Sequence, residues 1–369
     1  MKEILRDVAA WERAGKRVAM ARVVGIDGSG PRDPGAAMAV NEDGEVAGSV
    51  SGGCVEGAVV TEALEILNGD GAARRVTFGY SDDEAFAVGL TCGGTVHLLI
   101  ETSDGIPPSL VTAIDGKEPV AVATVTGLGR TNLGAKLLVG PQREPEGSLG
   151  NVDLDRVVAR DALAELDAGR STTRHYGLQG EARQNEVEVF IESFALPPRM
   201  VIFGAVDFTA ALSRIAKVLG YRVTVCDARP VFATPQRFPL ADEVVVDWPD
   251  RYLAREGGNL GPRDAVCVLT HDHKFDVPAI VAALTTRVGY LGAMGSRRTH
   301  DERAARLRTA GVDDAGLARV MGPIGLDIGA RTPEETAVSI CAEIIARRTG
   351  RHAPSLRDTD GPIHARGGE

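Results

Sequence analysis

Residues 199–346 alternate between short apolar segments and amphipathic segments, and this alternation limits the fold more than any other feature. Met200–Phe203 is expected to be a strand, Phe208–Leu219 a helix and Arg222–Cys226 a second strand. Further strands are expected at Glu243–Val246, Ala265–Leu269 and Val288–Leu291, with helices between them. Because strands that alternate with helices pair in parallel, the sequence predicts an α/β fold with a Rossmann-like, doubly wound parallel sheet in this region.

The nucleotide-binding fingerprint of such a sheet is incomplete in this chain. A G-x-G-x-x-G/A motif that starts at Gly204 would need glycine and a small residue where the chain has Val206 and Thr209. A β-branched side chain at position 206 is expected to hinder the approach of a pyrophosphate. Asp227, at the end of the second strand, is placed to bond ribose hydroxyls. NAD(P) binding is therefore doubtful on the sequence.

Polar residues follow several of the predicted strands, where ligands of open α/β sheets bind. His271 and Asp272 are expected to form hydrogen bonds at a pocket mouth, because His271-Asp272-His273 lacks the spacing of a metal site. Gly295-Ser296-Arg297 opens a helix, and it is either an anion site or a solvated helix start. The candidate cofactor-binding residues of this region are Gly204, Asp227, His271, Asp272, Gly295, Ser296, Arg297 and Asp327.

The first half of the chain repeats one order of segments. A strand, a loop, a returning strand, a Gly-Ser dipeptide, a helix and a strand that ends in Ile-Glu occur twice. The matching segments are Val18–Val24 and Val120–Thr126, Gly35–Val40 and Gly134–Val139, Gly48–Val50 and Gly147–Leu149, and Ile100-Glu101 and Ile191-Glu192. We therefore expect an N-terminal α+β domain over 1–196 with two related halves, about 15–101 and 118–192. The Pro197-Pro198 pair marks the boundary.

Two of the five cysteines lie beside Gly-Gly pairs, Cys54 before a predicted helix and Cys92 before a predicted strand. Unpaired N–H groups at the helix start are expected to attract an anion and to favour the reactive thiolate of Cys54. In the second half, Cys54 aligns with Asp153 and Cys92 with about Arg183, and this asymmetry favours a chemical role for the thiols in the first half. The alternative, that each cysteine is a small buried apolar residue, stays open.

The expected loop Gly25–Pro34 supplies two further candidates, Ser29 and Arg32. A guanidinium at this place could hold a phosphate or a carboxylate through two hydrogen bonds. A solvated loop arginine is an equally good interpretation of the sequence.

Charge and composition exclude some classes of protein. The formal net charge of −10 and the lack of a long basic run argue against nucleic acid as the main partner. No apolar run reaches membrane-spanning length and no secretory signal is evident, while five scattered cysteines fit free thiols in a reducing cytoplasm. The polar, Gly- and Pro-rich segment 347–369 is expected to be a disordered tail.

These motifs, in this order, resemble the XdhC/CoxI family, accessory proteins of xanthine dehydrogenase, carbon monoxide dehydrogenase and related molybdenum hydroxylases. The matching segments are Gly28–Arg32, Pro34–Ala36, Gly48–Glu56, Thr91–Gly94, Leu269–Asp272, Tyr290–His300, Ile324–Ala330 and Thr332–Glu335. The resemblance implies a homodimeric protein that binds molybdenum cofactor (molybdopterin), helps it to receive its terminal sulfur and inserts it into the target enzyme. One departure is Gly204-Ala205-Val206-Asp207-Phe208, where the family has Gly-Ala-Gly-His-Val, and it leaves the use of that turn open.

The leading hypothesis is a cytoplasmic cofactor chaperone rather than an independent enzyme, with a molybdenum hydroxylase and possibly a cysteine desulfurase as partners. Cys54 and Cys92 are the expected catalytic residues and the thiolate ligands of the molybdenum in the cofactor. The remaining cofactor-binding candidates are Ser29, Arg32, Ser51, Gly52, Gly53, Glu56, Gly93 and Gly94. An NAD(P)-dependent oxidoreductase that uses Asp227, and a scaffold in which both cysteines only pack, are the alternatives.

Overall fold

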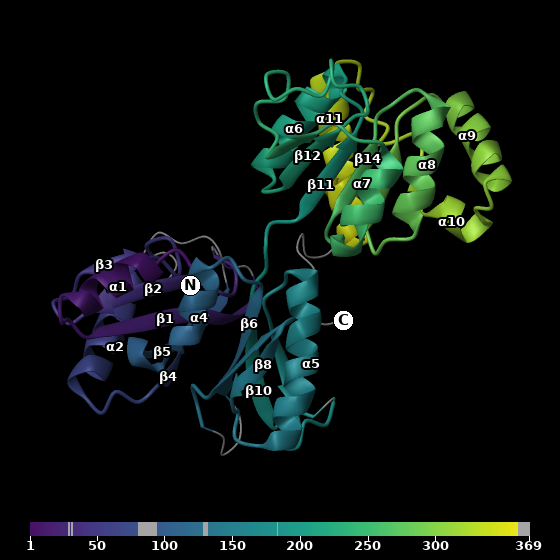
Figure 1. Cartoon of the computed structure of the whole chain (residues 1–369). Helices are drawn as coiled ribbons and strands as arrows, with labels where there is room; N and C mark the ends of the chain where they lie inside the picture. The colour runs from purple at the N-terminus through teal and green to yellow at the C-terminus, as the bar shows by residue number, and fades with distance from the viewer. Residues whose placement is uncertain (29, 31, 80–93, 128–131, 183, 361–369) are drawn as a thin grey trace. The chain divides into compact units, whose positions relative to one another are not determined.

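The computed structural model describes residues 1–28, 30, 32–79, 94–127, 132–182 and 184–360. Ser29, Cys92 and Gly93 therefore lie outside the described residues, as do residues 361–369 of the expected tail. The chain divides into two compact units, Met1–Leu196 and Pro197–Glu369 (Figure 1).

The first half of the first unit is an antiparallel sheet in the order β3-β2-β1-β5-β4, preceded by helix α1 (Leu5–Arg13). The strands are β1 (Val18–Asp27), β2 (Ala37–Asn41), β3 (Val46–Gly48), β4 (Arg74–Gly79) and β5 (Thr95–Thr102). Helix α2 (Glu56–Asn68) covers one face, because its buried side chains Val59, Ala63 and Ile66 join the same apolar core as alternate residues of β1 and β5.

The second half has the same strand order, β8-β7-β6-β10-β9. Its elements are β6 (Val120–Gly127), β7 (Lys136–Gly140), β8 (Arg143–Gly147), α5 (Val152–Ala168), β9 (Thr172–Tyr176) and β10 (Val187–Phe194), and α4 (Pro108–Asp115) joins the halves. An internal duplication predicts such a repeated order. The sequence patterns did not indicate β3, β4, β8 and β9, because these edge strands are short or exposed.

A buried charge cluster lies where the two halves meet. The Arg22 side chain is fully buried and donates to Glu101 at 2.6 Å and to Glu192 at 3.2 Å. Lys136 also binds Glu101, and burial lowers the pKa of its ammonium group. Glu101 and Glu192 occupy the same position in the two halves, so each copy contributes one carboxylate to the junction.

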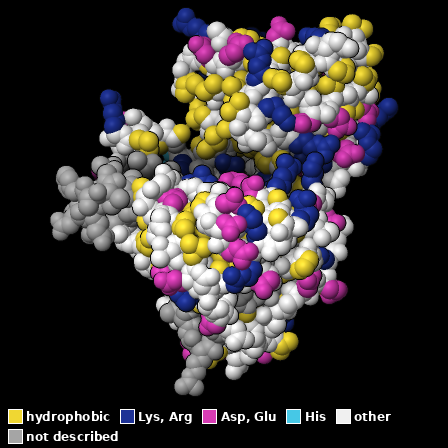
Figure 2. Space-filling model, turned by 90° about the vertical axis from the view of Figure 1, so that its left-hand side faces the viewer, with side chains coloured by type: hydrophobic (Ala, Val, Ile, Leu, Met, Phe, Trp, Pro, Cys, Tyr) yellow, Lys and Arg dark blue, Asp and Glu magenta, His cyan; other side chains and the backbone are white. Residues whose placement is uncertain are grey.

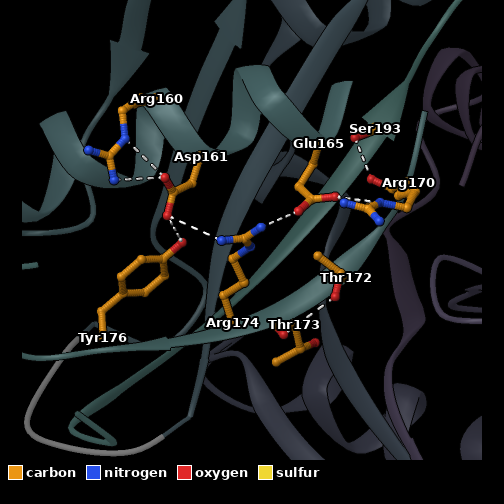
Figure 3. A network of polar contacts seen from close by, with 9 residues as sticks. All are labelled: Arg160, Asp161, Glu165, Arg170, Thr172, Thr173, Arg174, Tyr176 and Ser193. Atoms are coloured by element: carbon orange, nitrogen blue, oxygen red, sulfur yellow. Dashed lines mark hydrogen bonds and ion pairs between the residues drawn. The ribbon is translucent and has the colours of Figure 1, made fainter. Parts of the chain in front are cut away.

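Hydrogen bonds and ion pairs join α5 to β9 in the second half (Figure 3). The buried carboxylate of Glu165 accepts hydrogen bonds from Arg170 and Arg174, and Asp161 accepts from Arg174 and Tyr176. Burial, and then the neighbouring Asp161, raise the pKa of Tyr176. The positions of Glu165 and Arg174 correspond to Ile66 and Val76 in the first half. An ion pair in one copy therefore stands where the other copy has two apolar side chains.

The second unit is a six-stranded parallel sheet in the order β13-β12-β11-β14-β15-β16. The strands are β11 (Arg199–Phe203), β12 (Arg222–Cys226), β13 (Glu243–Val245), β14 (Ala265–Val268), β15 (Tyr290–Ala293) and β16 (Val320–Met321). Helices α6 (Asp207–Val218) and α11 (Pro333–Thr349) share one apolar core. Helices α7 (Pro249–Glu256), α8 (His273–Leu284) and α9 (Arg297–Thr309) share the other, and α10 (Asp314–Ala318) follows α9. The predicted Rossmann-like sheet is confirmed.

Local predictions in the second unit differ little from the structure. The expected strand at Val288–Leu291 lies two residues later, at Tyr290–Ala293, and the short β16 was not predicted. Thr332 and Glu335 form a capping box at the start of α11, which extends to Thr349. Among the described residues, no helix is long and apolar enough to cross a membrane. Figure 2 shows apolar side chains gathered over one face of this unit.

Candidate functional site

The topology brings two predicted segments of the first unit to one end of the first sheet. β1 ends at Asp27, opposite Thr95, where β5 begins, and the last residue of β4 also pairs with Thr95. Helix α2 ends near the start of β1, where Arg17 donates to the carbonyl of Leu67. The N-terminus of α2 therefore lies towards the opposite end of the sheet, where β1 ends. The Cys54 loop, which precedes α2, lies at this end, as does Gly94, which precedes β5.

The carboxylate of Glu56 organises the loop that carries Cys54. One oxygen accepts hydrogen bonds from the Ser49 hydroxyl and from the N–H groups of Val50, Ser51 and Gly52. The other accepts from the Ser51 hydroxyl and from the N–H groups of Gly53 and Val55. Partial burial acts to raise the pKa of Glu56, but the bonds from Ser51 and Ser49 outweigh it and hold the pKa at about 2.

This arrangement corrects the expectation of unpaired N–H groups at the start of α2. Those of Gly53 and Val55 bind Glu56, and that of Cys54 donates to the Ser51 hydroxyl at 2.9 Å. The cradle predicted for an external anion is thus filled by a carboxylate of the chain itself. Ser51, Gly52, Gly53 and Glu56 do lie together as predicted, but they bind one another.

The second half contains a simpler version of this loop. Asp155, which aligns with Glu56, accepts from Ser148 and from the N–H of Leu149, both at 2.7 Å. Helix α5 begins at Val152, with Asn151 as its N-cap, whereas α2 begins only at Glu56. Since Val152 aligns with Gly53, the first half has lost the opening turn of the helix, and Cys54 lies in the unwound segment.

Cys54 is a free, half-buried thiol. The Arg32 side chain, in the loop after β1, is 38% exposed, and its Nη2 lies 3.3 Å from a carboxylate oxygen of the exposed Glu3. This ion pair leaves part of the guanidinium accessible to a ligand. The described residues contain no group of three or more metal-ligating side chains. Cys92 and Ser29, the other chemical candidates of this unit, lie outside the described residues.

A hydrogen-bonded histidine, His97, lies at the same end of the sheet and was not predicted. His97 Nε2 lies 3.0 Å from Asp27, and the Thr77 hydroxyl lies 3.0 Å from His97 Nδ1. Each residue comes from a different strand, and only the pairing of β1, β5 and β4 brings them together. Because these partners are distant in the chain, no local motif could have indicated them.

The turn after β11 requires glycine at position 204. Gly204 has φ of 114°, and a Cβ at this position would lie 3.0 Å from the Thr270 backbone, so only glycine fits. Val206 is partly buried and packs against the apolar core. The buried Thr209 hydroxyl donates to the carbonyl of Gly204.

Asp227 is the clearest correction in the second unit. Its carboxylate accepts from the N–H of Ala205 at 2.8 Å and from the backbone and guanidinium of Arg229 at 2.7–2.9 Å. Burial acts to raise the pKa of Asp227, but the bonds from Arg229 and Ala205 lower it. Four donors thus share its two oxygens, and a ribose hydroxyl would have to compete with them for the carboxylate.

The other predicted residues of this edge divide into helix caps and exposed side chains. Asp272 is the N-cap of α8 and Ser296 the N-cap of α9, so both stabilise helices. His271 is exposed. Arg297 and Asp327 are brought together at 3.8 Å, as an exposed ion pair.

Behind this edge lies a buried network that the sequence patterns did not indicate. Asp276 accepts from the Thr270 hydroxyl and, at 3.0 Å, from Arg303, and burial raises its pKa. Arg303 also donates to the carbonyl of Met294 at 2.6 Å. The network ties the ends of β14 and β15 to α8 and α9. A buried Arg–Asp pair 27 residues apart has no local sequence signature.

Comparisons with known proteins agree on one family. The model of the XdhC and CoxI family matches residues 11–79 and 113–177, and that of the XdhC Rossmann domain matches residues 200–344. A Bacillus subtilis protein whose name describes it as a probable subunit of xanthine dehydrogenase is 28% identical over 89% of this chain and 92% of its own length. The Escherichia coli molybdenum cofactor insertion chaperone PaoD is 27% identical over 94% of this chain and 88% of its own length.

A crystal structure from Bacillus halodurans, titled a xanthine dehydrogenase, has the same fold. Its TM-score is 0.65 at 24% identity, over 96% of this chain and 98% of that one. The family models cover both units, and the relatives extend over nearly the whole chain. The chain belongs to the XdhC and CoxI family.

Proposed function

We propose that this protein binds molybdenum cofactor in the cytoplasm and delivers it to a xanthine dehydrogenase-type molybdenum hydroxylase. The names of the two curated relatives, one a cofactor insertion chaperone and the other a component of xanthine dehydrogenase, support the proposal. The observation that carries it is the unwound first turn of α2, which presents Cys54 in one copy of the repeat and has no counterpart in the other.

In this proposal the Cys54 and Cys92 thiolates are soft ligands for the molybdenum of the bound cofactor. Arg32 and Ser29 bind the phosphate of the pterin, and Gly93 and Gly94 give the backbone room for it. Ser51, Gly52, Gly53 and Glu56 hold the loop in shape, because their polar groups are already bonded to one another. A cysteine desulfurase supplies the terminal sulfur, and the protein acts as a homodimer.

The alternative, an NAD(P)-dependent oxidoreductase, is less well supported. Its strongest feature was Asp227, whose carboxylate is taken up by Ala205 and Arg229. Val206 and Thr209, where a nucleotide-binding motif has glycine and a small residue, also argue against this alternative.

The test is to purify the protein from a host that makes molybdenum cofactor and to measure bound molybdenum and pterin. The native chain is expected to carry both, and Cys54→Ser is expected to lose them while keeping its circular dichroism spectrum and unfolding midpoint. Asp153→Ser, at the equivalent place in the second half, is the matched control and is expected to keep both. Equal cofactor content in the native chain and in Cys54→Ser would contradict the role of the thiol.

A further inference from the structure

Ser51 binds the backbone of Cys54 through its side chain. The residue is buried, with 1% of its surface exposed, and its hydroxyl accepts hydrogen bonds from the N–H groups of Cys54 at 2.9 Å and of Val55 at 3.0 Å. The same hydroxyl donates to the carboxylate of Glu56. Ser51 therefore links the carboxylate that organises the loop to the residue that carries the thiol.

The charge of Glu56 fixes the direction of these three hydrogen bonds. A carboxylate with a pKa of about 2 is ionised at neutral pH and can only accept, so the single proton of the Ser51 hydroxyl must point towards it. The lone pairs of the hydroxyl then face the N–H groups of Cys54 and Val55. An alanine at position 51 would leave the N–H of Cys54 without this acceptor and that of Val55 with only its longer bond to Glu56.

The second half holds the equivalent N–H groups with a different residue. The two groups that align with those bound by Ser51 donate to the side chain of Asn151, at 2.8 and 3.2 Å. Asn151 aligns with Gly52, whereas the residue that aligns with Ser51 is Gly150. The capping side chain of the first half therefore lies one residue closer to the N-terminus than that of the second half.

This displaced cap leaves the backbone before Cys54 without side chains. At Gly52 and at Gly53 an added Cβ would meet no atom of the described residues within 4 Å outside its chain neighbours. Both glycines have positive φ, 82° and 122°, which other residues adopt only with strain. The turn that carries the thiol is thus fixed from inside by Ser51 and uncovered at the two residues before Cys54.

Ser49 separates the role of Ser51 from that of the loop as a whole. Its hydroxyl donates to the same carboxylate at 2.7 Å and accepts from the N–H of Gly52 at 2.9 Å, and neither bond involves Cys54. A serine stands at this place in both halves, whereas the serine at position 51 and the cysteine occur only in the first. We propose that Ser51 is the positioning residue of Cys54 and controls how its thiol is presented to the cofactor. The inference rests on the proposed function and names the side chain that regulates its thiol.

The test is the rate at which iodoacetamide alkylates Cys54, followed by mass spectrometry, in the full chain purified from a host that makes no molybdenum cofactor. Cys92→Ser is present throughout, and the cysteines at 226, 267 and 341 are buried. Ser51→Ala is expected to raise the rate at least about threefold, because the loss of a hydrogen bond lets the half-buried turn open more often. Ser51→Thr keeps the hydroxyl and is expected to stay within about twofold of the native rate.

Ser49→Ala is the matched control, since it removes a hydroxyl from the same carboxylate and no bond to Cys54. It is expected to keep the native alkylation rate even if urea unfolding shows the same loss of stability as in Ser51→Ala. If Ser51→Ala fails to fold, Ser51→Gly, which copies Gly150 of the second half, takes its place. Three results would each overturn the proposal: a native rate in Ser51→Ala, an equal increase in Ser49→Ala, or a rate in Ser51→Thr as high as in the alanine variant.

Cofactor content separates this proposal from the proposed function. From a host that makes the cofactor, Ser51→Ala is expected to be purified with at least about twofold less molybdenum and pterin than the native chain or Ser49→Ala. Equal content in Ser51→Ala and the native chain would overturn the positioning role. A native chain without cofactor would contradict the proposed function, while the alkylation rates, measured without cofactor, would still decide whether Ser51 controls the thiol.

Discussion

Replacing Glu56 with glutamine would remove the negative charge around which the Cys54 loop is folded. The carboxylate accepts seven hydrogen bonds, five of them from backbone N–H groups. A glutamine keeps one acceptor oxygen and turns an NH₂ group towards donors, so several N–H groups lose their partner. The gap between a pKa of 4.5 and one of about 2 corresponds to at most about 3 kcal/mol, and solvent screening of this partly exposed loop reduces the expected loss to about 1–2 kcal/mol.

The loss of stability in Glu56→Gln should become smaller as the pH falls. Because the folded-state pKa of Glu56 lies below its unfolded value, the carboxylate stabilises the fold fully above pH 4.5, and the contribution disappears as the pH falls towards 2. Urea unfolding of the native chain and of Glu56→Gln should therefore differ most at pH 7 and converge at the lowest pH at which both remain folded.

Asp155→Asn is the control for this prediction, since Asp155 holds the equivalent loop through two hydrogen bonds. We expect it to cost less than about 1 kcal/mol at pH 7. Equal losses in the two variants would refute the idea that the first loop depends more strongly on its carboxylate. A Glu56→Gln difference that does not shrink with falling pH would refute the electrostatic explanation.

Four further substitutions, at three places in the fold, can be tested by urea unfolding. Arg174→Val and Glu165→Ile should each lower the free energy of unfolding by about 1–3 kcal/mol. The double variant should lie within about 1 kcal/mol of the native chain, because an apolar contact replaces the partly exposed ion pair. A double variant as unstable as the sum of the single ones would contradict this. Arg22→Met should cost about 3 kcal/mol, since it removes the cation that Glu101 and Glu192 share and leaves them only Lys136 and the N-terminal ammonium group as partners, and a loss below about 1 kcal/mol would argue against that junction. Gly204→Ala should cost about 3 kcal/mol through its positive φ and the contact with Thr270, and an unchanged midpoint would mean that the turn can rearrange.

Periodicity was sufficient to predict the fold where side chains alternate between a buried and an exposed face. The strand Arg222–Cys226 has the predicted bounds, and the helix predicted at Phe208–Leu219 is displaced by one residue. The edge strands were not predicted because an exposed edge needs little apolar character. β8, for example, reads Arg-Glu-Pro-Glu-Gly and forms only because β7 offers its free edge.

The contacts within the Cys54 loop could not be predicted from the sequence. Ser51, Gly52, Gly53 and Glu56 lie together simply because they are neighbours in the chain. The sequence could not show that the Glu56 carboxylate would fold back onto the N–H groups before it, which depends on backbone angles that only Gly52 and Gly53 adopt easily. The same limit explains Asp227, whose partners are the turn after β11 and its near neighbour Arg229.

The duplicated half separates what the fold requires from what it does not. A hydroxyl and a carboxylate that hold the loop before the helix occur in both copies, as Ser49 with Glu56 and as Ser148 with Asp155, so this pair belongs to the architecture. The unwound turn and Cys54 occur in one copy only, and the second copy shows that the fold is complete without them. A shortened helix gives up backbone hydrogen bonds, and the first copy replaces them with a carboxylate that binds seven donors. The fold does not require this exchange, since the second copy forms without it, and this difference between the copies is what supports the proposed role of Cys54.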